Sequence, residues 1–215
     1  MPGNLVRIAA DDVPLELIGP LGCGLQTGTG GVMRSLACPA GSTIAIFDGG
    51  PVGLAAVMGA VVQDCETIIL VEPFAPRRDM ALSLGATPAC DVGAAIRAIL
   101  PDGVEFAFET SGRETVWRSP SPLFPATACS DWSACRSVPR AACRSILPHS
   151  SLTATASTAS TASSRGDSDL DTFILQLVEL YRTGRFPFDR PIRTFPLDRI
   201  NEALAAQLSG KLRRK

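Results

Sequence analysis

Residues 42–53, with the sequence STIAIFDGGPVG, join an apolar run to a glycine-rich turn and then to the start of a helical pattern. Residues 43–47 are apolar or β-branched, which predicts a buried strand. Residues 51–62 place small residues on one face at helical spacing, which predicts a helix. A strand, a glycine-rich turn and a helix in this order are typical of a dinucleotide-binding site.

The turn departs from the G-x-G-x-x-G pattern of such sites at one position. The second and third glycines are present as Gly50 and Gly53, but Asp48 stands in place of the first. Asp48 adds a side chain where the turn is tight, and it brings a carboxylate to the helix N-terminus that would bind a pyrophosphate. We therefore expect Asp48 to repel a dinucleotide.

An acid and two arginines support the same kind of site. Glu72 follows the apolar run 67–71 and lies 24 residues after Asp48, near the spacing at which an acid binds the adenosine ribose. Such an acid favours NAD over NADP, because it would repel a 2′-phosphate. Arg77 and Arg78 follow where a cation would cover the adenine or a phosphate, although each residue taken singly is also typical of a solvated surface.

Strands and helices alternate through the first half of the chain. We expect parallel strands at residues 43–47, 67–71, 89–92 and 104–109, and helices at 51–62, 77–84 and 94–100. Right-handed crossovers then predict an α/β fold with an incomplete Rossmann-type doubly wound parallel sheet. Towards the C-terminus we expect helices at 170–181 and 199–208, the second capped by Asp198, and a strand at 192–195.

Residues 116–165 differ in composition from the rest of the chain. Of these 50 residues, 31 are Ser, Thr, Ala or Pro, which indicates that little apolar surface is buried there. One interpretation is a flexible linker. The other is a stretch translated out of frame, because GC-rich codons for its Ala-Ser-Thr repeat encode a Leu-Asn-Gly repeat when read one base earlier. Under either interpretation we expect residues 119–164 to lack stable secondary structure.

Several short motifs resemble one family, in the same order along the chain. They are LGCGLQTG at 21–28, GPVGL at 50–54, LGA at 84–86, FETSGR at 108–113, GRFPFD at 184–189 and INEA at 200–203. Together they are similar to the zinc-dependent medium-chain alcohol dehydrogenases, and most similar to the aryl alcohol dehydrogenases among them. The resemblance covers residues 4–115 and 166–211.

The resemblance implies an oxidoreductase that moves a hydride from a primary or aromatic alcohol to NAD, with a catalytic Zn²⁺. It implies that Cys23 is a zinc ligand and that Thr27 lies beside the nicotinamide. It also implies a pyrophosphate loop and adenosine contacts, formed by Gly50, Pro51, Val52, Gly53, Glu72 and Arg77, and further cofactor contacts at Thr110 and Arg113. The partners implied are a small-molecule alcohol or aldehyde, with an oligomer left open.

The family's other zinc ligands and its proton relay come from an earlier domain, so no catalytic residue is assigned here. We expect a truncated form that is inactive by itself; the alternative is a non-catalytic NAD-binding remnant or a binding module. The expected divisions are a leading segment at 1–35 with the zinc region, a dinucleotide-binding half at 36–115, the biased segment at 116–165 and a helical remainder at 166–215.

Composition excludes other classes of protein. The net charge of −1 argues against a basic nucleic-acid-binding protein, and no apolar run approaches the roughly 18 residues of a membrane span. No signal-peptide pattern follows Met1. Seven scattered cysteines favour a reducing compartment, so we expect a cytoplasmic protein without a membrane or nucleic-acid partner.

Overall fold

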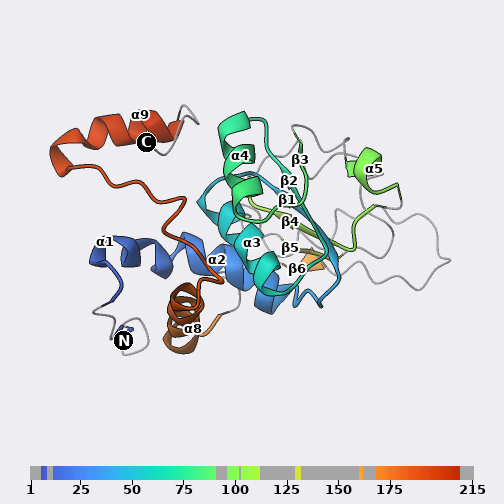
Figure 1. The fold of residues 1–215 in the computed structure, drawn as a ribbon, viewed down its shortest axis with the longest axis horizontal. Coiled ribbons are helices and arrows are strands. Elements are labelled where there is room, and N and C mark those ends of the chain that lie inside the picture. Colours follow the sequence, from blue (N-terminus) through green and yellow to red (C-terminus); the bar gives the residue numbers. More distant parts are fainter. Residues whose placement is uncertain are drawn as a thin grey trace.

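The computed structural model describes residues 6–8, 12–90, 96–101, 103–111, 129–131, 160–161 and 168–208. Its centre is a six-stranded parallel sheet in the order β3-β2-β1-β4-β5-β6 (Figure 1). The strands are β1 (Thr43–Phe47), β2 (Thr67–Val71), β3 (Ala89–Cys90), β4 (Phe106–Glu109), β5 (Cys129–Asp131) and β6 (Ser160–Thr161). This strand order is that of the Rossmann fold, and the predicted fold class is confirmed.

The first four predicted strands are confirmed. Strands β1 and β2 have the predicted bounds, β3 is described over Ala89–Cys90, and β4 begins two residues later than expected. Residues 91–95 lie outside the described part of the chain.

Strands β5 and β6 correct one prediction, because both fall within 119–164, where we expected no secondary structure. Cys129 pairs with Phe106 and Ser130 with Ala107, so β5 extends the edge that β4 presents. Backbone hydrogen bonds build such a pair whatever the side chains are, and composition therefore does not exclude it. The other residues of the biased segment lie outside those that the structure describes.

Helices connect the strands. They are α1 (Leu15–Ile18), η2 (Gly19–Gly22), α2 (Gly24–Gly30), the π-helical turn η3 (Gly31–Ser35), α3 (Pro51–Val62), α4 (Ala75–Ser83), α5 (Ile96–Ile99), α8 (Leu170–Arg182), η6 (Leu197–Arg199) and α9 (Ile200–Leu208). Helix α3 has its predicted bounds. Helix α4 begins before Arg77 because Pro76 is accommodated in its first turn.

Two predictions near the C-terminus are wrong. Residues 192–195 form no strand, and the guanidinium of Arg193 lies 4.6 Å from the centroid of the Phe195 ring instead. Asp198 lies inside η6 and not at the helix cap, because the 3₁₀ turn begins after Pro196. In Figure 1, the following helix α9 stands away from the sheet at the end of an extended segment.

Apolar side chains cover both faces of the sheet. Ile44 and Ile46 of β1 point into a large cluster shared with α2, α3 and α8, whereas Ala45 and Phe47 point into a smaller cluster with Ile96 of α5. This alternation is what a strand covered on both faces requires. No described helix is long and apolar enough to cross a membrane.

The glycines of α2 allow it to lie directly against α3. A Cβ at Gly28 would collide with the Val52 carbonyl oxygen, and one at Gly59 would come within 3.2 Å of Thr29. The Thr29 hydroxyl donates to the Ala55 carbonyl oxygen of α3 at 3.3 Å. The glycine-rich sequence before β1 therefore permits a close helix–helix contact beside the sheet.

Candidate functional site

Three parallel strands end together and bring distant residues to one edge of the sheet. Phe47 of β1 is in register with Val71 of β2 and with Glu109 of β4. The residues that follow are consequently neighbours: the Asp48 N–H donates to the Val71 carbonyl at 3.0 Å. The Thr110 hydroxyl donates to the Phe47 carbonyl at 2.8 Å. In doubly wound sheets this carboxyl edge is where ligands bind.

The glycine turn has the backbone approach that the motif requires. A Cβ at Gly53 would collide with the Asp48 carbonyl oxygen, so the turn and the first turn of α3 are in direct contact. Gly50 is the residue that precedes α3, and Pro51 is its first residue. Pro51 suits this position because it has no N–H to satisfy. The predicted pyrophosphate loop of Gly50, Pro51, Val52 and Gly53 therefore lies at the N-terminus of α3.

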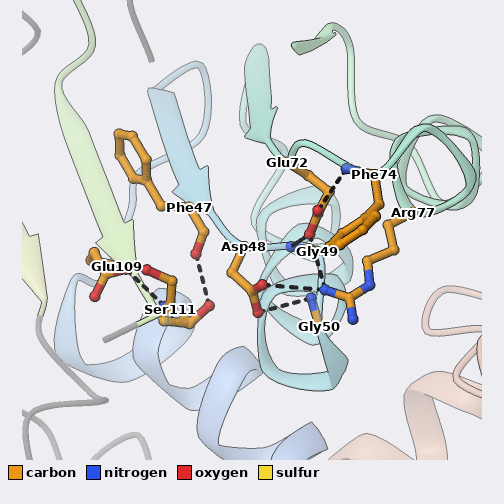
Figure 2. A network of polar contacts seen from close by, with 10 residues as sticks. Phe47, Asp48, Gly49, Gly50, Glu72, Phe74, Arg77, Glu109 and Ser111 are labelled. Atoms are coloured by element: carbon orange, nitrogen blue, oxygen red, sulfur yellow. Dashed lines mark hydrogen bonds and ion pairs between the residues drawn. The ribbon is translucent and has the colours of Figure 1, made fainter. Parts of the chain in front are cut away.

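Asp48 adopts a backbone conformation that favours glycine, with φ of +84°. Its carboxylate turns back onto the loop, where Oδ2 accepts the Gly50 N–H at 3.0 Å. Oδ1 accepts a hydrogen bond from Nη1 of Arg77 at 3.4 Å (Figure 2). The carboxylate thus lies at the helix N-terminus, as the sequence indicated, and it is held there by its own contacts.

Glu72 is fully buried directly after β2. Its Oε2 accepts the Gly49 N–H at 2.7 Å, and its Oε1 accepts the Phe74 N–H at 2.9 Å. Both carboxylate oxygens therefore hold loop backbone, which satisfies the charge that burial would otherwise make costly. The residue predicted to bind a ribose thus also joins the loop after β1 to the loop after β2.

Arg77 joins the two acids. Its Nη1 lies 3.2 Å from Glu72 Oε2 and 3.4 Å from Asp48 Oδ1, and its guanidinium lies 5.1 Å from the centroid of the Phe74 ring. One guanidinium is therefore shared by two carboxylates. Figure 2 shows the three converging over the glycine turn.

Two further predicted residues lie on or beside helix α2. Cys23 precedes α2 and is exposed, and Thr27 is half-buried one turn later, with its N–H donating to the Cys23 carbonyl at 3.0 Å. The start of α2 faces the loop, because a Cβ at Gly24 would lie 3.5 Å from that of Pro51. Arg113 falls outside the described residues, so its predicted contact stays a prediction.

Comparisons with known proteins point to one family. Residues 51–124 match the family model described as zinc-binding dehydrogenase. "Geraniol dehydrogenase" from Castellaniella defragrans is 37% identical over 216 residues, which is 97% of this chain and 56% of that protein. A "probable alcohol dehydrogenase" from Pseudomonas sp is 54% identical over 90 residues, 41% of this chain and 28% of that protein.

Solved structures agree. The benzyl alcohol dehydrogenase of Acinetobacter calcoaceticus superposes with a TM-score of 0.83 at 30% identity, covering 97% of this chain and 58% of that one. An alcohol dehydrogenase zinc-binding domain protein of Burkholderia ambifaria gives 0.81 at 36% identity, with 97% and 56% covered. The chain is related to the medium-chain alcohol dehydrogenases. The geraniol dehydrogenase and the two solved structures match almost all of this chain. The chain itself spans a little over half of the length of each of them.

The zinc expected of a medium-chain alcohol dehydrogenase does not fit the described residues alone. Within those residues, no three His, Cys, Asp or Glu side chains come together as a metal site. A catalytic zinc in proteins takes three protein ligands. Cys23 is therefore one predicted ligand that belongs to no described group of three, and no reaction step is derived through zinc.

The dinucleotide of a medium-chain alcohol dehydrogenase fits the backbone of the loop but not its charge. Gly53 lets the backbone of the turn lie directly against α3, and Glu72 lies at the expected strand end. Asp48, however, takes the Gly50 N–H that a phosphate oxygen would seek. The loop thus has the backbone shape of a dinucleotide-binding turn and carries a carboxylate at its helix N-terminus.

Sequence reasoning missed how these side chains pair. Asp48 and Arg77 are 29 residues apart, and no local pattern shows that they meet. It also missed Phe74, whose ring lies beneath the Arg77 guanidinium, and Glu109, which accepts the Ser111 N–H at 2.7 Å. The sequence pattern that could have indicated these contacts was the predicted parallel sheet, because residues that follow adjacent parallel strands lie side by side.

Proposed function

We propose that this chain is the cofactor-binding part of an NAD-dependent alcohol dehydrogenase. The observation that carries the proposal is the strand–turn–helix around Gly50 and Gly53, with Glu72 at the end of the neighbouring strand. NAD, when bound, supplies the hydride acceptor. A relative named for geraniol and a structure named for benzyl alcohol support an alcohol, primary or aromatic, as the substrate class.

Each residue of the loop then has a defined task. Gly50 and Gly53 admit the pyrophosphate to the N-terminus of α3, and Glu72 accepts a ribose hydroxyl and repels a 2′-phosphate. Arg77 covers the adenosine side, Thr27 contacts the nicotinamide, and Thr110 contacts the cofactor from the loop after β4. Catalysis needs zinc ligands in addition to Cys23. The described residues therefore support cofactor binding more strongly than they support turnover of an alcohol.

The four divisions expected from the sequence, at 1–35, 36–115, 116–165 and 166–215, are part of this proposal, as is a cytoplasmic location. One alternative is a non-catalytic NAD-binding module. It is favoured by a specific observation, namely that Cys23 has no described companion ligands. Turnover of an alcohol by the purified chain would exclude this alternative.

The test is calorimetric titration of the chain with NAD and with NADP. We expect weak binding of NAD and weaker binding of NADP. Replacing Glu72 by Gln removes the charge that repels a 2′-phosphate, so Glu72→Gln should weaken NAD and reduce the preference between the two cofactors. Glu66→Gln, an exposed acid before β2, is the matched control and should change neither affinity. Equal binding of NAD and NADP by the unaltered chain would contradict the proposed role of Glu72.

A further inference from the structure

We propose that Asp48 is an internal substitute for a phosphate, so that the site selects an adenine nucleoside without phosphates over adenine nucleotides. The inference rests on the proposed function, because it concerns the same adenosine site. It adds the residue that decides which ligands that site accepts. Its basis is the arrangement of Asp48, Gly50 and Arg77.

The first step concerns the amide. Asp48 Oδ2 accepts the Gly50 N–H at 3.0 Å, directly before α3. Pro51 has no N–H, so the Gly50 amide is the donor that directly precedes α3, beside the N–H groups of the first turn of the helix. Even a Cβ at Gly50 would lie 2.6 Å from Asp48 Oδ2, so the carboxylate fills the space over the turn. A phosphate oxygen must displace this carboxylate before it can take the amide.

The second step concerns the cation. Arg77 would neutralise a bound phosphate, but its Nη1 is already shared between Asp48 and Glu72. The side chain of Arg77 is only 25% exposed and that of Asp48 is 31% exposed, so water screens their charges incompletely. An incoming phosphate adds negative charge beside two carboxylates that share one guanidinium. Asp48 therefore weakens the binding of a phosphate in two ways: its carboxylate occupies the Gly50 amide, and its negative charge repels the phosphate.

The third step concerns adenosine, which carries no phosphate. Adenosine has no group for the position that Asp48 fills, so the carboxylate can keep the Gly50 amide while adenosine is bound. Glu72 Oε2 already accepts the Gly49 N–H and contacts Arg77, so a ribose hydroxyl must compete with these contacts. That competition is the same for adenosine and for ADP, so it cancels in the ratio of their affinities. The ratio then reports on Asp48.

The experiment measures the dissociation constants of adenosine, ADP and NAD for the unaltered chain and for Asp48→Asn. Asparagine keeps an oxygen that accepts the Gly50 N–H and tolerates positive φ, while it removes the charge. We expect the unaltered chain to bind adenosine at least as tightly as ADP. Asp48→Asn should strengthen ADP and NAD by on the order of tenfold and leave adenosine within about twofold. Asp48→Gly should strengthen ADP further, because it also vacates the amide.

Asp64→Gly is the matched control. Asp64 is exposed, follows α3 and also has a positive φ, of 56°, so this change removes the same charge and the same backbone strain away from the turn. It should leave all three affinities unchanged. Thermal melts of each variant establish that the chain is folded.

Three outcomes would overturn the inference. If the unaltered chain binds ADP and NAD more tightly than adenosine, or if Asp48→Asn leaves the ratio of these affinities unchanged, Asp48 does not set the selectivity, although the proposed function stands. If Asp64→Gly strengthens ADP as much as Asp48→Asn does, the effect is one of overall charge. If no variant binds adenosine, ADP or NAD, the proposed function fails together with the inference.

Discussion

At the scale of single residues, the acids around the glycine turn hold backbone as well as charge. Glu72 is buried and accepts the N–H groups of Gly49 and Phe74. Asp48 accepts the N–H of Gly50. The loop that the proposal assigns to the cofactor therefore has its shape before any cofactor binds, because carboxylates of the chain satisfy its amides.

This double role predicts that Glu72→Gln destabilises the fold. Glutamine offers one acceptor oxygen and one NH₂ group, so one of the two loop amides loses its partner and Arg77 loses an ion pair. We expect a loss of about 2 kcal/mol in the free energy of unfolding, because an unsatisfied buried amide costs about 1–3 kcal/mol. Urea denaturation measures it, with exposed Glu66→Gln as the control expected to stay within about 0.5 kcal/mol. Equal stability of the two variants would show that Glu72 does not organise the loop.

A second residue-scale prediction concerns the thiol of Cys65. A hydrogen bond with the Cys38 thiol lowers the pKa of Cys65, and this effect outweighs partial burial and the nearby carboxylates of Asp64 and Glu105, which raise it. A lowered pKa means that the thiolate forms at lower pH, so alkylation of Cys65 by iodoacetamide should begin at lower pH than for an ordinary cysteine. Cys38→Ala should move the profile to higher pH.

Mass spectrometry of the alkylated peptides, taken across pH, measures this shift. Cys90→Ala is the matched control, because Cys90 is no cause of the lowered pKa. The prediction is wrong if Cys38→Ala and Cys90→Ala give the same profile for Cys65.

At the scale of elements, the helix α2 shows what a glycine pattern can and cannot reveal. The motif at residues 21–28 is rich in glycine, and the structure shows that its backbone lies against α3. The sequence pattern identified α3 and the strands β1 and β2 to the residue, because the strands are runs of apolar and β-branched residues and α3 carries small residues at helical spacing. It did not identify α2, whose glycines are poor helix formers and whose helix is stabilised by packing on α3.

This packing predicts a large effect of Gly28→Ala. The added Cβ would collide with the Val52 carbonyl oxygen and lie 2.9 Å from the Ala55 Cβ, so α2 must move away from α3. We expect a loss of about 2 kcal/mol or more, within the range for overpacked cores. Gly22→Ala is the control, because no atom lies within 4 Å of its Cβ and the expected change is small. Thermal unfolding of the two variants distinguishes steric packing from helix propensity, which would favour alanine at both positions.

At the scale of the whole molecule, the sequence predicted the class of sheet but not its full width. Composition suggested that residues 119–164 lacked strands, yet β5 and β6 pair in parallel beyond β4. The reason is that edge pairing depends on backbone hydrogen bonds, which composition does not report. The candidate site was also predicted only in part. The parallel strands predicted that Asp48, Glu72 and Thr110 lie at one edge of the sheet. The contact between Asp48 and Arg77 was not predicted, because Arg77 lies on α4 and its side-chain position depends on the folded structure.

The final prediction concerns activity, where the whole chain is tested at once. The purified chain should not oxidise benzyl alcohol with NAD, and added Zn²⁺ should not change this result. Cys23 is exposed and has no described companion ligands, so zinc at this position lacks the three protein ligands that catalysis requires. Asp48 also reduces activity, because its carboxylate holds the Gly50 amide and repels the pyrophosphate of NAD. A repulsion of about 1.4 kcal/mol lowers the affinity for NAD tenfold.

The measurement is the absorbance of NADH with benzyl alcohol, NAD and Zn²⁺, run beside Cys23→Ser and Cys90→Ser. Turnover that Cys23→Ser abolishes and Cys90→Ser preserves would show that Cys23 holds a working zinc, and that the remaining ligands come from residues beyond those described. The binding module would then be excluded, and the chain would be an enzyme in its own right. Absence of turnover together with NAD binding is the result that the geometry of the turn and the isolation of Cys23 among the described residues lead us to expect.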